Sequence, residues 1–131
     1  MALKILVVDD SKLMRNTVKS VFSKMQIACE FIEADDGSEA LTQLVQQPIE
    51  LVLLDWNMPK LSGLDFLKKV RHMERYKTLP IIMVTSKTAR ANVIEAIQNG
   101  ATDYVTKPIN VDLFIEKLTR LPFFKAYKRK D

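Results

Sequence analysis

Short apolar runs alternate along the chain with longer segments in which apolar and polar positions are mixed. The clear runs are Ile5–Val8, Leu51–Leu54 and Ile81–Val84, and weaker ones lie at Cys29–Ile32 and Tyr104–Val105. Their length and their lack of strict alternation are typical of strands buried on both faces of a parallel sheet. We therefore expect five strands.

Between these runs the apolar residues recur at helical spacing, three or four positions apart. Ser11, or Asp10 before it, is placed to cap the first such segment, Asn110 to cap the last, and Gly100 to end the fourth. Strands and helices in alternation predict an α/β fold with a parallel sheet and right-handed crossovers. The expected helical segments run from Leu13 to Met25, Ala40 to Val45, Leu64 to Met73, Val93 to Ile97 and Leu113 to Leu121.

Polar side chains follow the predicted central strands at the point where each strand ends. Asp9 and Asp10 follow the first run, Asp55 the third, Thr85 the fourth, and Lys107 comes just after the fifth. In an open parallel sheet, ligands bind beyond the carboxyl ends of the strands, where the strand order reverses. With a strand order of 2-1-3-4-5, the first and third strands are neighbours about 4.8 Å apart, so the three carboxylates share one pocket.

Three carboxylates that lie so close repel one another unless protons or cations offset their charge. Lys107 supplies one positive charge, and Mg²⁺ is the natural second because it prefers oxygen ligands and keeps places for substrate phosphate. The Thr85 hydroxyl and the Lys107 ammonium are the donors that a phosphoryl group needs. The pattern predicts attack by a carboxylate on phosphorus, aided by metal and lysine, to give an aspartyl-phosphate.

Taken together, these motifs resemble the receiver domains of two-component response regulators, over about residues 3–120. The resemblance implies a flavodoxin-like (CheY-like) doubly wound α/β fold, with five parallel strands in the order 2-1-3-4-5 and five helices. We assign residues 1–121 to the receiver domain and 122–131 to a basic C-terminal tail. The residues that carry the resemblance are Asp9-Asp10-Ser11, Gly37-Ser38-Glu39-Ala40-Leu41, Leu51 to Pro59, Gly63, Val84-Thr85-Ser86, Gly100-Ala101-Thr102-Asp103-Tyr104 and Lys107-Pro108.

The resemblance also implies a role for each residue around the pocket. Asp55 is the expected phospho-acceptor. Asp10, Asp55 and the backbone carbonyl of Asn57 are expected to bind Mg²⁺ directly, and Asp9 mainly through a metal-bound water. Thr85 and Lys107 are expected to contact the phosphoryl oxygens.

Further residues are expected to set the response to phosphorylation. Thr85 and Tyr104 form the switch pair that moves inward, which changes the face from about Ala89 to Arg120. Asn57 and Lys87 tune the lifetime of the phosphoryl group. Lys87 departs from the family pattern, since it replaces the acid of the best-known chemotaxis member. The peptide bond between Lys107 and Pro108 is expected to be cis.

No DNA-binding or catalytic domain follows residue 121, so we expect output through protein binding. The resemblance points to a cytoplasmic, monomeric chemotaxis regulator that receives phosphate from a histidine kinase and docks on the flagellar motor switch. Such a protein is not a conventional enzyme, but it catalyses its own phosphorylation and dephosphorylation. Two alternatives stay open: a phosphorelay intermediate that passes phosphate to a histidine phosphotransfer protein, and a non-phosphorylated scaffold of receiver fold.

Two other classes of α/β protein fit the sequence less well. A phosphatase of the haloacid dehalogenase type needs a general acid two residues after its nucleophile, where this chain has Asn57. A flavodoxin-like cofactor binder needs a phosphate-cradling loop after the first strand, but Asp9 and Asp10 would repel phosphate there. The chain has only three glycines, and no glycine-rich nucleotide-binding motif is present.

Charge and composition change this picture little. The formal charge of +4 arises within residues 120–131, where five basic residues face one acidic residue, and the preceding 119 residues balance at fifteen of each sign. The net charge is therefore no indication of nucleic-acid binding by the domain itself. The apolar runs are too short to cross a bilayer, Met1 leads straight into the first run without a signal peptide, and a single cysteine, Cys29, suits a reducing cytosol.

Overall fold

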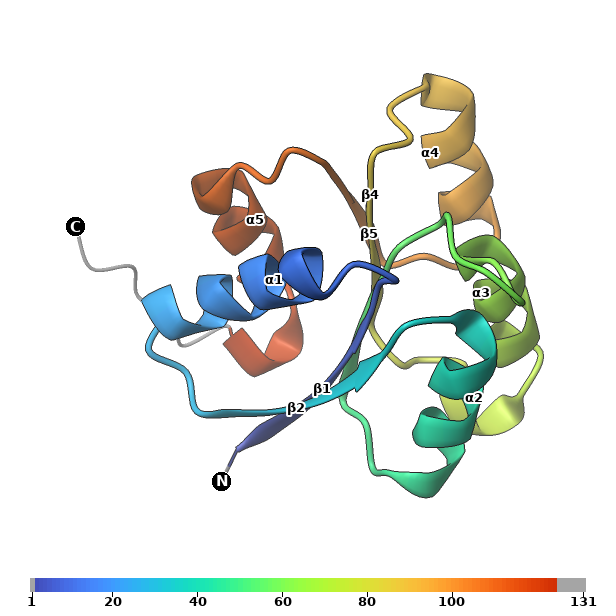
Figure 1. The fold of residues 1–131 in the computed structure, drawn as a ribbon, viewed down its shortest axis with the longest axis horizontal. Coiled ribbons are helices and arrows are strands. Elements are labelled where there is room, and N and C mark those ends of the chain that lie inside the picture. The colour runs from blue at the N-terminus through green and yellow to red at the C-terminus, as the bar shows by residue number, and fades with distance from the viewer. Residues whose placement is uncertain (1, 125–131) are drawn as a thin grey trace.

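The computed structural model describes residues 2–124 and contains one five-stranded parallel sheet (Figure 1). The strand order is β2-β1-β3-β4-β5, so the expected order is confirmed. Each run of apolar residues forms a strand at or within two residues of its expected place. The strands are β1 (Leu3–Val8), β2 (Cys29–Ala34), β3 (Leu51–Leu54), β4 (Ile81–Thr85) and β5 (Asp103–Thr106).

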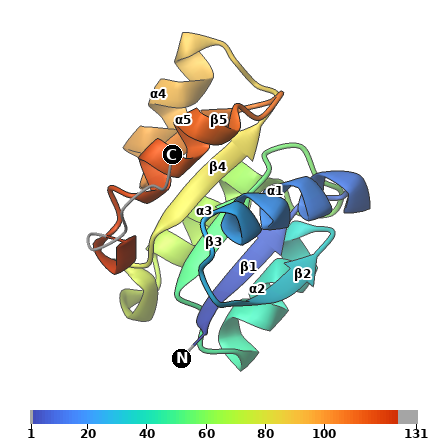
Figure 2. The same cartoon turned by 90° about the vertical axis from the view of Figure 1, so that its left-hand side faces the viewer.

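Helices cover both faces of the sheet. α1 and α5 lie on one face and α2, α3 and α4 on the other, and Figure 2 shows α1 and α5 in front of the strands. None of the helices within residues 2–124 has the length and apolar character that a bilayer span requires. The helices are α1 (Lys12–Lys24), α2 (Gly37–Gln46), α3 (Gly63–Arg71), α4 (Arg90–Gln98) and α5 (Val111–Leu118), with short 3-10 turns η1 (Glu74–Tyr76) and η2 (Pro122–Phe124).

Side-chain caps fix where four of these helices begin. The Ser11 hydroxyl accepts a hydrogen bond from the backbone N–H of Met14 at 3.2 Å, and Asn110 caps α5 in the same way. Both caps agree with the sequence prediction. Asp36 and Ser62 cap α2 and α3, and the sequence analysis had not singled them out. Each cap satisfies a backbone donor that would otherwise have no partner in its helix.

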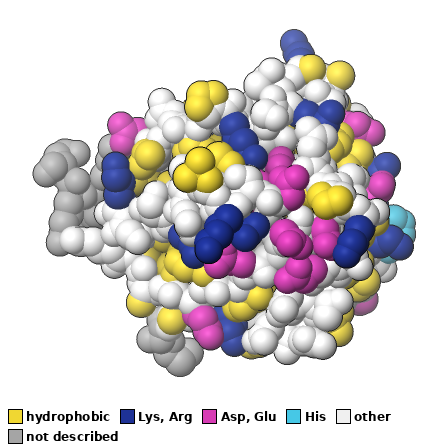
Figure 3. Space-filling view, viewed as in Figure 1, with side chains coloured by type: hydrophobic (Ala, Val, Ile, Leu, Met, Phe, Trp, Pro, Cys, Tyr) yellow, Lys and Arg dark blue, Asp and Glu magenta, His cyan; other side chains and the backbone are white. Residues whose placement is uncertain are grey.

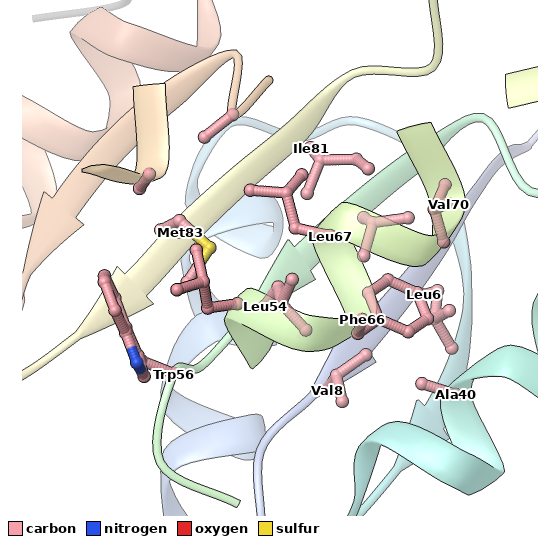
Figure 4. Close-up of a cluster of buried hydrophobic side chains, with 14 of the residues drawn as sticks. Leu6, Val8, Ala40, Leu54, Trp56, Phe66, Leu67, Val70, Ile81 and Met83 are labelled. Carbon is pink, nitrogen blue, oxygen red and sulfur yellow. The ribbon is translucent and has the colours of Figure 1, made fainter. Parts of the chain in front are cut away.

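The core is divided by the sheet into two layers. Leu6 and Val8 of β1 point toward α2 and α3, where Phe66 and Leu67 pack against them (Figure 4). The alternate residues of β1 point to the other layer, under α1 and α5. Because the central strands are covered on both sides, their buried parts, Ile5–Val8, Leu51–Leu54 and Ile81–Val84, are apolar without interruption. Burying each large side chain contributes roughly 1.5–3 kcal/mol.

Several members of the apolar helical patterns lie outside this core. Leu13 is 75% exposed. Met73 follows the end of α3 but is partly buried and packs against the core. A helix on a sheet buries a single stripe, so apolar residues at the margins of the stripe stay in contact with solvent. The other exposed members are Val45, Ile94, Ile97 and Leu113.

The chain stays packed beyond α5. Phe124, in η2, is buried, and its ring lies 6.5 Å from that of Phe22 on α1. The remainder of the predicted basic tail, residues 125–131, lies outside the described residues.

Two glycines allow backbone segments to approach closely. A Cβ atom on Gly63 would lie 1.9 Å from the carbonyl oxygen of Asp55, and one on Gly37 would lie 2.3 Å from that of Leu61. The Gly63 N–H also donates to the carbonyl of Trp56 at 2.9 Å. The start of α3 is therefore pressed against the end of β3, and this contact holds the segment that carries Asp55.

Candidate functional site

Three carboxylates meet at the carboxyl edge of the sheet. Val8 and Leu54 are paired in register on β1 and β3, so the residues that follow them, Asp9 and Asp55, lie side by side. With Asp10, they offer carboxylate oxygens that all lie within 4.8 Å of one another. Asp9 and Asp55 are only 4% and 6% exposed, whereas Asp10 is exposed. Acidic side chains gather near the middle of the face drawn in Figure 3.

Lys107 places a positive charge between the two buried carboxylates. Its Nζ atom lies 2.8 Å from Asp9 Oδ2 and 3.4 Å from Asp55 Oδ2. Burial alone would lower the pKa of Lys107, but the hydrogen bond to Asp9 and the charges of Asp55 and Asp9 outweigh it and raise the pKa. The lysine is therefore a fixed cation at neutral pH.

The surroundings of Asp55 disfavour its ionised form. Burial raises its pKa above the ordinary value, and the charge of Asp9 adds to the effect. Lys107, a hydrogen bond from Thr85 and the N–H of Trp56, which donates to Asp55 Oδ1 at 2.7 Å, oppose the rise without cancelling it. A nearby cation, or a reaction that removes the negative charge, therefore stabilises this carboxyl group.

The donor set at this edge fits Mg²⁺. Three carboxylates and one lysine give a summed charge of −3 + 1 = −2, and Lys107 pairs with Asp9 and Asp55 but not with Asp10. The ligands are all oxygen atoms, and exposed Asp10 leaves the group open to water, as a hydrated Mg²⁺ requires. Asn57 is exposed on the segment after β3. Its role as a carbonyl ligand stays a prediction.

Thr85 and Tyr104 lie behind the carboxylates. Thr85 is fully buried at the end of β4, and its Oγ1 atom accepts a hydrogen bond from the Lys87 N–H at 3.4 Å. The Tyr104 ring is also buried, and its hydroxyl donates to the Lys87 carbonyl at 2.7 Å. This bond holds the buried ring against the backbone that follows β4. Movement of the pair on phosphorylation stays a prediction.

Lys87 extends over an aromatic ring at the pocket. Its Nζ atom lies 5.4 Å from the centroid of the Trp56 ring, which is the distance of a cation–π contact. The sequence analysis assigned Lys87 a role in the lifetime of the phosphoryl group without finding this partner. The sequence did contain an indication of this contact. Trp56 directly follows Asp55 and Lys87 lies two residues after Thr85, so both residues are close to the predicted pocket.

Arg15 is a residue near the site that the sequence analysis missed. Its Nη1 atom donates to the Asp9 carbonyl at 2.6 Å, and its Nε atom donates to Glu33 at 2.9 Å. Lys19, one helical turn further along α1, also pairs with Glu33. Two basic residues four positions apart, facing a strand that carries a glutamate, were the signal for this contact. Arg15 fixes the backbone of Asp9.

A cleft of about 340 Å³ lies on the face formed by α4, β5 and α5. The buried Tyr104 is among its lining residues, and Ile97 and Leu113 border it with partly exposed apolar side chains. Lys117 donates to the Tyr104 carbonyl and pairs with Asp103. A change in the position of the Tyr104 ring would therefore alter the shape of this face directly.

Comparison with known proteins agrees with this arrangement. Residues 5–119 match the response regulator receiver domain. The chain is 40% identical over 117 residues to chemotaxis protein CheY1 of Helicobacter pylori, covering 88% of this chain and 94% of that protein. It is also 40% identical over 119 residues to chemotaxis protein CheY of Pseudomonas aeruginosa, covering 91% and 95%. The solved structure of the chemotaxis response regulator CheY4 of Vibrio cholerae superposes with a TM-score of 0.81 at 33% identity, covering 92% and 98% of the two chains.

Proposed function

We propose that this chain, which belongs to the response regulator receiver domain family, is a single-domain response regulator that accepts a phosphoryl group on Asp55. One observation carries the proposal. Asp55 is a buried carboxylate with a raised pKa that lies 3.4 Å from the ammonium of Lys107. Family membership supports phosphoryl transfer as the reaction, and the surroundings of Asp55 support this residue as the acceptor.

In the proposed reaction, a carboxylate oxygen of Asp55 attacks the phosphorus of a phosphohistidine on a histidine kinase. The O–P bond forms as the P–N bond breaks, and the electron pair stays on the donor imidazole. Asp10, Asp55 and the Asn57 carbonyl would hold Mg²⁺, with Asp9 acting through water. When bound, Mg²⁺ supplies positive charge that reduces repulsion between the incoming phosphoryl group and the carboxylates.

Lys107 and Thr85 stabilise the product. The lysine ammonium donates to a phosphoryl oxygen from the side of Asp9, and the Thr85 hydroxyl donates to another. Self-dephosphorylation is the attack of water on the same phosphorus, which returns the Asp55 carboxylate and releases inorganic phosphate. Both steps use the same residues of the chain.

Output is proposed to run through the face formed by α4, β5 and α5. A Thr85 hydroxyl engaged by phosphate favours the inward Tyr104 ring, and the cleft bordered by Ile97 and Leu113 takes its binding shape. A partner that prefers one shape by about 1.4 kcal/mol gains about tenfold in affinity. Because the relatives are named as chemotaxis proteins, we place this protein in chemotaxis, as a cytoplasmic monomer whose partner is a flagellar motor switch protein. A phosphorelay role is the second candidate.

Acceptance is tested by incubating the protein with Mg²⁺ and acetyl phosphate and measuring its intact mass. We expect the addition of one base-labile phosphoryl group, which Asp55→Asn abolishes and Asp35→Asn, at an exposed position, leaves in place. Lys107→Ala should reduce acceptance, and a chelator of Mg²⁺ should stop it. Labelling of Asp55→Asn at the wild-type level would remove Asp55 as the acceptor.

The output surface is tested with beryllofluoride, which mimics the phosphoryl group. Amide shifts in the NMR spectrum should extend from the pocket to α4, β5 and α5, and Tyr104→Ala should weaken capture of a motor switch protein. Shifts that stay within the pocket would move the output to another surface. Rapid transfer of the phosphoryl group to a histidine phosphotransfer protein, without phosphorylation-dependent capture of the switch protein, would favour the phosphorelay.

A further inference from the structure

A second, larger cleft lies at the opposite edge of the sheet from Asp55. Its volume is about 580 Å³, and it is formed by the ends of α3 and α4 and by the segments that lead into β4 and β5. Arg71, His72 and Lys77 contribute to its wall. The other lining residues carry hydroxyl or amide groups or are glycine, and no acidic or apolar side chain is among the residues that line it.

Arg71 is the centre of this cleft and differs from the otherwise similar Arg15. Both guanidinium groups are half-buried, and in both Nε and Nη1 donate hydrogen bonds. Arg15 reaches the carboxylate of Glu33, but Arg71 reaches only the backbone carbonyls of Gly100 at 2.9 Å and Tyr76 at 2.7 Å. Within residues 2–124, Arg71 has no carboxylate partner within ion-pair distance. Its charge is partly removed from water without the opposite charge that normally compensates for burial.

The other groups around Arg71 are suited to an anion. His72 donates through Nδ1 to the Lys68 carbonyl at 2.6 Å, which leaves Nε2 of the neutral ring as an acceptor, so the donors that the cleft offers to an anion are on Arg71, Thr102 and Lys77. The Thr102 oxygen accepts the Ile81 N–H at 3.0 Å, which leaves the hydroxyl proton free to donate. Lys77 is exposed and adds an ammonium group.

We propose that this cleft, defined by Arg71, His72 and Lys77, binds the phosphate group of a small phosphorylated metabolite. Guanidinium, ammonium and hydroxyl donors are the groups that recognise phosphate oxygens. The absence of aromatic and aliphatic lining residues argues for a polar, hydroxyl-bearing ester rather than a nucleotide base or an acyl chain.

The site is spatially separate from Asp55. It lies at the amino ends of β4 and β5, whereas Asp55 follows the carboxyl end of β3. Asn99 and Gly100, which line it, end α4, the helix that borders the proposed output face. A ligand here would therefore contact the far end of that helix and bias its position.

The test uses inorganic phosphate and glycerol 3-phosphate as probes, with the full chain in a chelator of divalent cations. The chelator suppresses phosphate binding at the carboxylate pocket, so this test and the test of Asp55 can fail separately. We expect saturable NMR shifts at the amides of Thr78, Gly100 and Thr102, with dissociation constants in the millimolar range or below. Glycerol alone, and sodium chloride at matched ionic strength, should not reproduce them.

Charge-removing variants give the matched comparison. Lys77→Ala should weaken binding severalfold, while Lys69→Ala, which removes an exposed lysine on α3 outside the cleft, should not. Cations at helix C-termini also stabilise helices without any ligand, and that role predicts no saturable binding. Shifts that grow linearly with salt, or equal weakening by Lys69→Ala and Lys77→Ala, would overturn the site.

Discussion

Residues 2–124 contain two groups of three carboxylates whose oxygens lie within 4.8 Å of one another. The first, here named the strand-end group, lies at the ends of β1 and β3, and the second, the helix-start group, lies where β2 leads into α2. Each group has buried and exposed members and a lysine nearby. The strand-end group is Asp9, Asp10 and Asp55, and the helix-start group is Asp35, Asp36 and Glu39.

The surroundings shift the pKa values of the buried carboxylates Asp36 and Asp55 in opposite directions. The Glu39 N–H donates to Asp36 at 2.8 Å, and this bond, with the nearby Lys60, lowers the pKa of Asp36. Burial and the neighbouring Asp9 instead raise the pKa of Asp55. Asp36 is an anion that the start of a helix stabilises, and Asp55 is an anion that its surroundings disfavour. Close carboxylates can therefore differ in how well their surroundings stabilise the ionised form, and the raised pKa makes Asp55 the candidate for a functional role.

The two lysines should differ most. Lys107 is 16% exposed and contacts two buried carboxylates, whereas Lys60 is 72% exposed and lies 3.6 Å from Asp36. We expect Lys107→Ala to lower the free energy of unfolding by about 2 kcal/mol, because it leaves two buried charges without a partner. Lys60→Ala should change it by less than about 0.5 kcal/mol. Urea unfolding in the presence of a chelator measures both, and equal losses would contradict the comparison.

The second expected difference between the two groups is their affinity for Mg²⁺. Trp56 is the only tryptophan and follows Asp55, so its fluorescence should report Mg²⁺ binding at the strand-end group. Asp10→Asn should weaken binding by about tenfold, which is about 1.4 kcal/mol, since it removes one charged ligand. Asp35→Asn, the matched change in the helix-start group, should leave the titration unchanged. If Asp35→Asn, rather than Asp10→Asn, weakened the Mg²⁺-dependent fluorescence change, the ion would bind at the helix-start group instead.

Acid should affect the two buried carboxylates with opposite sign. Asp36→Ala should cost about 1 kcal/mol at neutral pH, and Asp36→Ser should recover most of the loss because serine also caps a helix. Since the folded pKa of Asp36 is lowered, its contribution is present above about pH 4 and is lost as pH falls further.

The same measurement on Asp55 should give the opposite dependence of stability on pH. Its folded pKa is raised, so ionisation costs stability as pH rises from 3.8 through the folded pKa. Asp55→Asn should therefore be more stable than the parent at neutral pH, by up to about 1 kcal/mol, and the gain should shrink toward pH 4. Urea unfolding from pH 4 to 8, without divalent cations, measures the difference, and a gain that grows in acid would contradict the raised pKa.

The smallest expected effect concerns the lifetime of the phosphoryl group. Lys87 lies over Trp56 beside the strand-end group, and Lys60 lies beside the helix-start group. Charge reversal by Lys87→Glu should change the rate of self-dephosphorylation by about twofold to threefold while acceptance continues, because a charge near the pocket mouth acts through little screening. Lys60→Glu is the control and should not alter the decay. Identical decay for both variants would show that Lys87 has no part in it.

The sequence predicts the strands well because a strand buried on both faces needs an unbroken apolar run. It predicts the meeting of Asp9 and Asp55 because parallel strands end at the same edge. It does not separate Asp9-Asp10 from Asp35-Asp36, since both pairs directly follow a strand and precede a helix. Strand order separates them: β1 lies between two strands and β2 is at the edge of the sheet, without a second neighbour that brings another acid.

Contacts between distant segments were also beyond the sequence. Helical periodicity identifies the apolar face of α4 but not how deeply it is buried, so the exposure of Ile94 and Ile97 was not foreseen. The contact of Arg71 with Gly100 joins the last residue of α3 to the turn after α4, 29 positions away, and no local pattern marks it. The same holds for Lys87 and Trp56, whose contact depends on how β3 and β4 place their ends.

The contact between Gly63 and the Asp55 carbonyl has a consequence for the mutational tolerance of this protein. Any side chain at position 63 would meet backbone atoms, which have no freedom to move aside, so a saturation library should return glycine alone. Gly100 is a different case, because its φ of +104° disfavours side chains while the nearest atoms belong to the flexible Arg71. Asparagine and aspartate should survive there at reduced frequency. Deep mutational scanning would thus show two glycine positions with different profiles, one set by space and the other by backbone conformation.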